Sequence, residues 1–191
     1  MPTAAFRTGT DTPQGTEAEM EVVMAAATDG SFRIAVTETA DLSAIRSIHE
    51  AAFGQSAEAD LVEALVANGH AAISLAAIVE DRLIGHILLS RLVEPAGALA
   101  LAPLAVSPEC QRRGVGSALV RAAIGAARAG RHDAIFVLGS PDFYGRFGFS
   151  PEAARAFRCA YAGAHFMVLA PSGAPPAPGP VVYPPPFADL G

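Results

Sequence analysis

A glycine-rich segment between an apolar run and an amphipathic helix is the part of the chain best suited to chemistry. It reads Gln-Arg-Arg-Gly-Val-Gly-Ser-Ala over 111–118. The first-turn amides of a helix lack partners within the helix, and the helix dipole places partial positive charge beside them. Gly114 and Gly116 let a ligand approach that backbone closely, and Arg112 and Arg113 add charged donors. The pattern therefore predicts a site for a phosphate or pyrophosphate.

The residues of this segment exclude two other phosphate-binding motifs, the P-loop and the dinucleotide-binding fingerprint. A P-loop needs a lysine, whereas all 13 basic residues of the chain are arginines. A dinucleotide fingerprint needs a third glycine where Leu119 stands, and the candidate acid, Asp133, precedes the next predicted strand instead of ending it. The alternative that stays open is a glycine-rich helix start that binds nothing.

Apolar periodicity predicts the elements that must position this segment. A helix is expected over 114–129, and a proline, Pro103, interrupts the apolar run before it and indicates an edge strand or a bulge. Hairpins give antiparallel neighbours and a strand–helix–strand unit gives parallel ones, so the fold class is α/β with a mixed sheet. Further strands are expected over 32–38, 73–80, 83–91, 99–106, 134–138, 157–161 and 166–169, and further helices after the caps Asp41, Ser56 and Ser140.

Length and composition indicate one compact domain. The chain has 191 residues, of which 51% are hydrophobic, enough for a sizeable core. Residues 1–30 show no sustained period and no signal-peptide pattern, so they are expected to form a mobile leader. The domain is expected over 31–170. The Pro-rich segment 171–191 is expected to pack on it as an extended strap.

Charge and cysteine content exclude several classes of function. The net charge is −6, which argues against a nucleic-acid partner, and no run approaches the roughly 18 apolar residues of a membrane span. Two cysteines, Cys110 and Cys159, make neither a disulfide framework nor a Cys-based zinc site, so a reduced, cytoplasmic location and no metal are expected. The histidines without metal-ligand spacing are His49, His70, His132 and His165.

Two segments together resemble the GNAT superfamily of acyl-CoA-dependent N-acetyltransferases. Gln111-x-x-Gly114-x-Gly116 is similar to the family's Q/R-x-x-G-x-G/A motif, and the run Tyr-Gly-Arg-Phe-Gly-Phe over 144–149 is similar to its Y-x-x-x-G-F motif. The resemblance extends from about residue 32 to the C-terminus. It is strongest to the YhbS-type branch, through Phe136-Val137-Leu138-Gly139 and Val182-Tyr183-Pro184.

This resemblance implies a mostly antiparallel central sheet, flanked by helices, in which two central strands splay apart. Pantetheine would lie in the gap and pair with strand backbone, while the pyrophosphate would lie on the amides of residues 113–118. The implied cofactor-binding residues are Leu104, Ala105, Val106, Gln111, Arg112, Arg113, Gly114, Val115, Gly116, Ser117, Ala118 and Tyr144.

The resemblance also implies an activity, transfer of an acetyl group from acetyl-CoA to a primary amine of a small molecule or peptide by direct attack. Tyr144 matches the family's usual general acid, although its ring could instead merely pack among neighbouring phenylalanines. The alternative function is a non-catalytic acyl-CoA-binding sensor or regulatory module. The expected partners are acetyl-CoA and an amine, and a homodimer is compatible with the sequence.

The general base is left open by the sequence. An alkylamine with a pKa near 10.4 is almost wholly protonated at neutral pH, so a group must accept its proton. The run 98–106 carries no acid that could do so. Besides a chain of water molecules, the candidates are Glu58, Glu63, His86, Glu94 and Asp142.

Removal of residues 1–30 is expected to leave folding and acetyl-CoA binding unchanged, because this segment has no periodic apolar face to bury. The check is the Tm of the full and shortened chains, each with and without acetyl-CoA. A shortened chain that fails to fold would contradict the expectation.

Overall fold

The computed structural model describes residues 32–173 and 175–189. The strands are β1 (Arg33–Val36), β2 (Ala71–Val79), β3 (Arg82–Arg91), β4 (Leu99–Val106), β5 (Ile135–Leu138) and β6 (Phe166–Leu169). The α-helices are α1 (Leu42–Phe53), α2 (Ala57–Ala67), α3 (Val115–Ala129), α4 (Pro141–Tyr144) and α5 (Pro151–Ala154). Four short 3-10 helices are η1 (Thr39–Asp41), η2 (Pro108–Cys110), η3 (Gly145–Phe147) and η4 (Pro185–Asp189).

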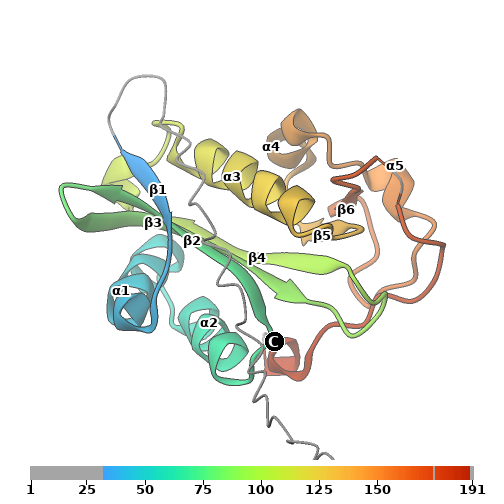
Figure 1. The fold of residues 1–191 in the computed structure, drawn as a ribbon, viewed down its shortest axis with the longest axis horizontal. Helices are drawn as coiled ribbons and strands as arrows, with labels where there is room; N and C mark the ends of the chain where they lie inside the picture. Colours follow the sequence, from blue (N-terminus) through green and yellow to red (C-terminus); the bar gives the residue numbers. More distant parts are fainter. Residues whose placement is uncertain (1–31, 174, 190–191) are drawn as a thin grey trace, which may run out of the picture.

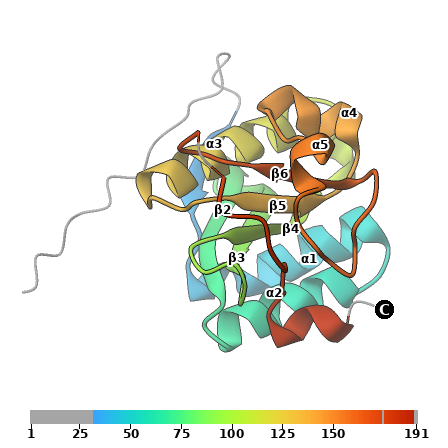
Figure 2. The same cartoon turned by 90° about the vertical axis from the view of Figure 1, so that its right-hand side faces the viewer.

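One six-stranded sheet in the order β1-β2-β3-β4-β5-β6 forms the centre of the molecule. Its β4–β5 pair is parallel and the other pairs are antiparallel. Helix α3 covers one face, and α1 and α2 cover the other (Figures 1 and 2). The predicted α/β class with a mixed, mostly antiparallel sheet is confirmed.

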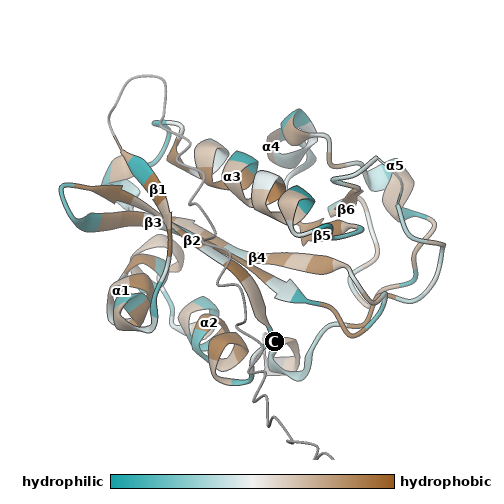
Figure 3. Cartoon of the chain, viewed as in Figure 1, coloured by the Kyte–Doolittle hydropathy of each residue, from teal (hydrophilic) through white to brown (hydrophobic). Residues whose placement is uncertain are grey.

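The apolar residues form two cores, one on each face of the sheet. Alternate residues of a strand point to opposite faces, so Leu99 and Leu101 join the α3 core while Ala98 and Ala100 join the α1/α2 core. Figure 3 shows the apolar strands inside and the polar tip of the β2–β3 hairpin, residues 80–82, outside. Within the described ranges, no helix is long and apolar enough to cross a membrane.

The parallel pair β4–β5 is short, and this shortness opens the centre of the sheet. The paired residues are Leu99–Leu101 of β4 and Ile135–Val137 of β5. Residues 102–106 of β4 continue beside β3 alone, and a register shift lies between Ile87 and Leu89 of β3. The backbone of β4 on the β5 side is therefore left without a strand partner beyond Leu101, as the resemblance implied for splayed strands.

The strand predicted over 157–161 is wrong. Phe157 is buried and packs edge-on against Phe136 of β5, with ring centroids 4.9 Å apart. The backbone of Arg158 bonds to the C-terminal segment, accepting from Val181 N at 2.7 Å and donating to Gly179 O at 2.9 Å. The segment 157–161 thus pairs with the C-terminal segment through Arg158 instead of extending the sheet.

The C-terminal segment crosses the α1/α2 side of the molecule. Val182 forms an antiparallel bridge with Glu94, and the side chains of Val181 and Phe187 are buried in the α1/α2 core. Residues 185–189 form η4, a short regular element that the proline content did not predict. The leader expected over 1–30 lies outside the described residues.

The three predicted helix caps differ in detail. None of Asp41, Ser56 and Ser140 caps its helix (α1, α2 or α4) through its side chain. Asp41 instead accepts a hydrogen bond from the Glu38 amide at 2.8 Å, which closes η1 before α1 begins. Gly54 ends α1 with a φ of 74°, the left-handed conformation that favours glycine.

Candidate active site

The loop between β4 and α3 presents backbone amides to solvent. Gly114 has a φ of 84° and Arg112 a φ of 60°, so two positions of this loop are left-handed. The first bond of α3 runs from Ala118 N to Gly114 O at 3.0 Å, and the N-cap residue, Gly114, has no side chain that could cap the helix. The amides of its first turn therefore point to the space before the helix, where an anion is favoured. The left-handed backbone conformation of Arg112 costs free energy, and such strained residues are concentrated in loops that bind ligands.

A pocket of about 560 Å³ lies directly at this helix start. It contains two arginines and no acidic residue, so its charge suits a phosphate. The lining residues are Leu104, Val106, Cys110, Gln111, Arg112, Gly114, Gly116, Ser117, Phe143 and Arg146. Leu104 and Val106 belong to residues 102–106 of β4, which pair with β3 and have no strand on the β5 side, so the pocket and the gap in the sheet adjoin.

Gly116 sets the depth of this pocket. A β carbon at Gly116 would lie 3.6 Å from Val106 Cγ2, 3.8 Å from Phe143 Cζ and 4.0 Å from Leu104 Cδ2, all ordinary contact distances. An alanine would fit the empty pocket, whereas a branched side chain would project into it.

Arg146 and Phe143 are pocket residues that the sequence did not single out. The guanidinium carbon of Arg146 lies 4.9 Å from the ring centroid of Phe143 and 5.5 Å from that of Phe147. Arg146 Nε also donates to Phe143 O at 3.2 Å. These contacts hold a cation at the pocket although Arg146 itself is exposed. The only available signal was an arginine among aromatic residues in the motif over 144–149.

Other predicted cofactor-binding residues have structural contacts of their own. Gln111 Nε2 donates to Val106 O at 3.1 Å and ties the loop to the end of β4. The side chain of Ala105 is buried opposite His86 of β3, and Val115 is buried in the α3 core. Arg113 lines a separate hollow, and Ala118 packs half-buried beside the α3 core. For the buried residues Ala105 and Val115, only the backbone is left to face the predicted ligand.

Tyr144 lies at the end of α4, just after β5. Its ring packs edge-on against Phe143 at 4.9 Å and Phe149 at 5.6 Å. It also covers Gly139 so closely that any β carbon there would collide with the ring. Burial raises the pKa of Tyr144 to about 12, so its phenol stays protonated at neutral pH.

A family model for the Acetyltransferase (GNAT) family matches residues 42–149, more than half of the chain. The chain belongs to the GNAT family. The uncharacterized N-acetyltransferase YjhQ of Escherichia coli K12 is 43% identical over 129 residues, covering 64% of this chain and 71% of YjhQ. The uncharacterized N-acetyltransferase YhbS of the same strain is 30% identical over 128 residues, covering 64% and 76%.

Two crystal structures are similar to this GNAT protein over most of both chains. YhbS from Escherichia coli in complex with CoA has a TM-score of 0.76 at 27% identity and covers 84% of this chain and 94% of its own. A GNAT acetyltransferase from Brucella melitensis in complex with acetyl-CoA has a TM-score of 0.71 at 29% identity and covers 82% and 97%. The predicted family and enzyme class, N-acetyltransferase, are thereby confirmed.

The acidic candidates for the general base of this GNAT protein are already engaged or exposed. Glu63 accepts from Arg46 at 2.7 Å, and this bond lowers the pKa of Glu63. Glu58 accepts from Gln55 Nε2 at 3.2 Å. Glu94 is exposed and lies at the bridge to Val182. Asp142 is exposed and lies in the first turn of α4.

His86, the remaining candidate, belongs to a buried hydrogen-bond chain. His49 Nε2 lies 2.9 Å from His86 Nδ1, and His86 Nε2 lies 2.9 Å from Ser74 Oγ, which in turn contacts Thr37 Oγ1. Both imidazoles are fully buried, and burial lowers the pKa of His49 to about 4 and of His86 to about 3. Both are neutral at pH 7, and neither is exposed to a ligand in the pocket.

In the part of the chain that the structure describes, no group of three His, Cys, Asp or Glu side chains is placed so that it could hold a metal ion.

Proposed function

We propose that the chain transfers an acetyl group from acetyl-CoA to a primary amine of a small molecule or peptide by direct attack. The observation that carries this proposal is the pocket of about 560 Å³ that joins the α3 N-terminus to residues 104–106 of β4, where no strand pairs on the β5 side. Two relatives with this fold are crystallised with CoA and with acetyl-CoA.

The backbone of two segments would hold the donor. The first-turn amides of α3 would bind the pyrophosphate, with Arg112 and Arg146 as further donors at the rim. The backbone of 104–106 pairs with β3, and on its β5 side it would offer hydrogen-bonding groups to the pantetheine amides in the gap, as a neighbouring strand would. The thioester would then lie between β4 and β5.

Acetyl transfer in this gap needs one bond to form and one to break. The neutral amine nitrogen attacks the thioester carbonyl, the C–S bond breaks, and the electron pair leaves on sulfur. The nitrogen releases one proton to a chain of water molecules, and the thiolate accepts a hydrogen bond and leaves as CoA. Holding both reactants in one gap supplies much of the rate by proximity.

Tyr144 is the proposed hydrogen-bond donor to the leaving sulfur. With its pKa near 12, full proton transfer to a thiolate of pKa about 8.5 would cost about 5 kcal/mol. A hydrogen bond that strengthens as charge develops on sulfur avoids this cost and still lowers the barrier.

The proposed transfer is tested by incubating the full chain with acetyl-CoA and a panel of primary amines while free thiol is measured. We expect thiol release above the amine-free rate with at least one amine, and an acetylated product of matching mass. A chain that binds acetyl-CoA by calorimetry and releases no thiol with any amine would instead support a binding module.

Tyr144→Phe is expected to lower kcat by about 10- to 100-fold, because one hydrogen bond to a charged atom is lost while the ring packing stays. KM for acetyl-CoA should change less, since the bond strengthens only as sulfur departs. Steady-state kinetics with the best amine of the panel measure both. Tyr161→Phe, at a tyrosine that packs on Tyr183 of the C-terminal segment, is the matched control. A change under about twofold in Tyr144→Phe would leave Tyr144 a packing residue.

A further inference from the structure

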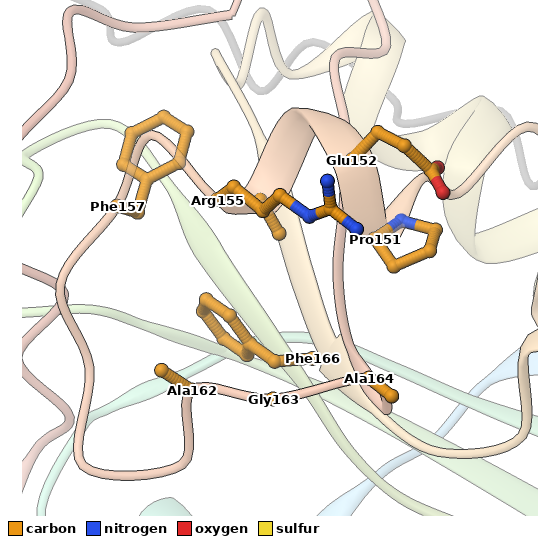
Figure 4. Close-up of a pocket in the computed structure, with 9 residues that line it drawn as sticks. Pro151, Glu152, Arg155, Phe157, Ala162, Gly163, Ala164 and Phe166 are labelled. Atoms are coloured by element: carbon orange, nitrogen blue, oxygen red, sulfur yellow. The ribbon is translucent and has the colours of Figure 1, made fainter.

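A second pocket, of about 460 Å³, lies between α5 and the segment 162–164. Figure 4 shows the rings of Phe157 and Phe166 on one side and Arg155, which reaches toward Pro151 and Glu152, on the other. The proposed donor site uses none of these residues, and none of them lines the pocket at the start of α3.

This second pocket lies one strand away from the gap, on the β6 side of β5 and on the sheet face opposite α3. Phe166 is the strand partner of Leu138, the first β5 residue beyond the last β4–β5 pair. Directly opposed strand residues share a face, and Phe166 belongs to the α1/α2 core. The proposed acetyl-CoA site fills the α3 side of the gap. An acceptor amine therefore has to approach the thioester from the α1/α2 side.

One exposed apolar side chain, Leu138, lies between the gap and this pocket. Leu138 is 52% exposed although it lies in an inner strand of the sheet, and it is the strand partner of Phe166. Phe157 and Phe166 are themselves buried and both pack on Phe136, with ring centroids 4.9 and 5.6 Å apart, so they form a rigid floor for the pocket. A ligand with an apolar body would cover Leu138.

Of the two charged side chains at the rim of this pocket, Glu152 is engaged in hydrogen bonds and Arg155 is not in an ion pair within the described ranges. Glu152 bonds its own backbone amide and accepts from Ser150 Oγ at 3.1 Å, and these bonds, with a smaller contribution from the charge of nearby Arg155, lower its pKa. Arg155 forms no ion pair with any carboxylate of the described residues. The guanidinium donors are thus available to a ligand, and carboxylate is their best-matched partner.

We propose that this second pocket binds the acceptor and selects amines whose apolar body carries a carboxylate, which Arg155 binds. The inference rests on the proposed acetyl transfer and names its substrate class. The primary amine would extend over Leu138 into the gap, and the carboxylate would stay at the far rim of the pocket.

The test uses the full chain saturated with CoA and two probes that differ in one group. They are para-(aminomethyl)benzoate, which has the amine, the ring and the carboxylate, and para-(aminomethyl)benzamide, which lacks the negative charge. Calorimetry should show the acid binding about 10-fold more tightly than the amide, the low end for a hydrogen bond to an exposed charged group. Arg155→Gln should remove this preference, and Arg155→Lys should retain part of it.

Arg158→Gln is the matched control, because Arg158 is exposed on the same segment and its backbone makes the hydrogen bonds to Gly179 and Val181. This variant should keep the preference for the acid. Equal affinity for acid and amide, no binding of either, or a preference that survives Arg155→Gln would overturn the proposal. Acid binding through Arg155 without acetyl transfer to any amine would overturn the proposed function and leave the pocket assignment standing.

Discussion

Gly116→Val is expected to weaken acetyl-CoA binding by about 100-fold or more while leaving the free protein at least as stable as wild type. The valine methyl groups would occupy the space through which the pyrophosphate reaches the first-turn amides, and two charge-assisted hydrogen bonds lost together amount to about this factor. The β carbon itself meets only ordinary contacts, and valine has a higher helix propensity than glycine. Calorimetry with acetyl-CoA measures the affinity, and urea unfolding measures the stability.

Gly125→Ala is the matched control for this variant. Gly125 lies in the interior of the same helix, and nothing approaches its missing β carbon within 4 Å. The alanine should raise the free energy of unfolding by about 0.5 to 1 kcal/mol and leave acetyl-CoA affinity unchanged. Wild-type affinity in Gly116→Val would show that the pyrophosphate lies elsewhere, and reduced stability would show that the empty pocket cannot hold the branched side chain.

The fold was predictable where a single local pattern decides the structure. Helix α3 follows from one apolar stripe and a glycine at each end, and the β2–β3 hairpin follows from two apolar runs around three charged residues. The prediction for segment 157–161 was wrong because its backbone partner is the C-terminal segment. A local sequence pattern indicates an extended backbone and cannot indicate which distant segment pairs with it. A sheet neighbour and a tail neighbour satisfy the same backbone groups equally well.

The site divides in the same way. The glycines at 114 and 116 indicated an anion site because their chemistry acts through the local backbone. Phe143 and Arg146 reach the pocket only because α4 and η3 fold back against the start of α3. The partner of His86 is His49, 37 residues earlier in another element, and no spacing in the sequence indicates that contact.

This histidine pair is expected to make the fold sensitive to mild acid. Burial lowers the pKa of His49 and His86 from the ordinary 6.5 to about 4 and about 3, so the unfolded chain binds protons that the folded chain does not. The stabilisation is therefore complete above pH 6.5 and is lost as the pH falls toward the folded values. Two such groups give a slope of up to about 2.7 kcal/mol per pH unit and a loss of about 4 kcal/mol between about pH 7 and about pH 5.

Urea unfolding at these two pH values measures the loss, and a window that ends at pH 5 separates it from the carboxylates. Asp60, Glu63 and Glu152 have lowered pKa values, so they titrate below this range. The double variant His49→Asn, His86→Gln should lose most of the pH dependence, whatever its stability at neutral pH, because neither new side chain titrates. His165→Gln, at an exposed histidine, should keep the wild-type dependence. A wild-type free energy of unfolding that stays level across the window would mean that the pair is hydrated and charges within the folded protein.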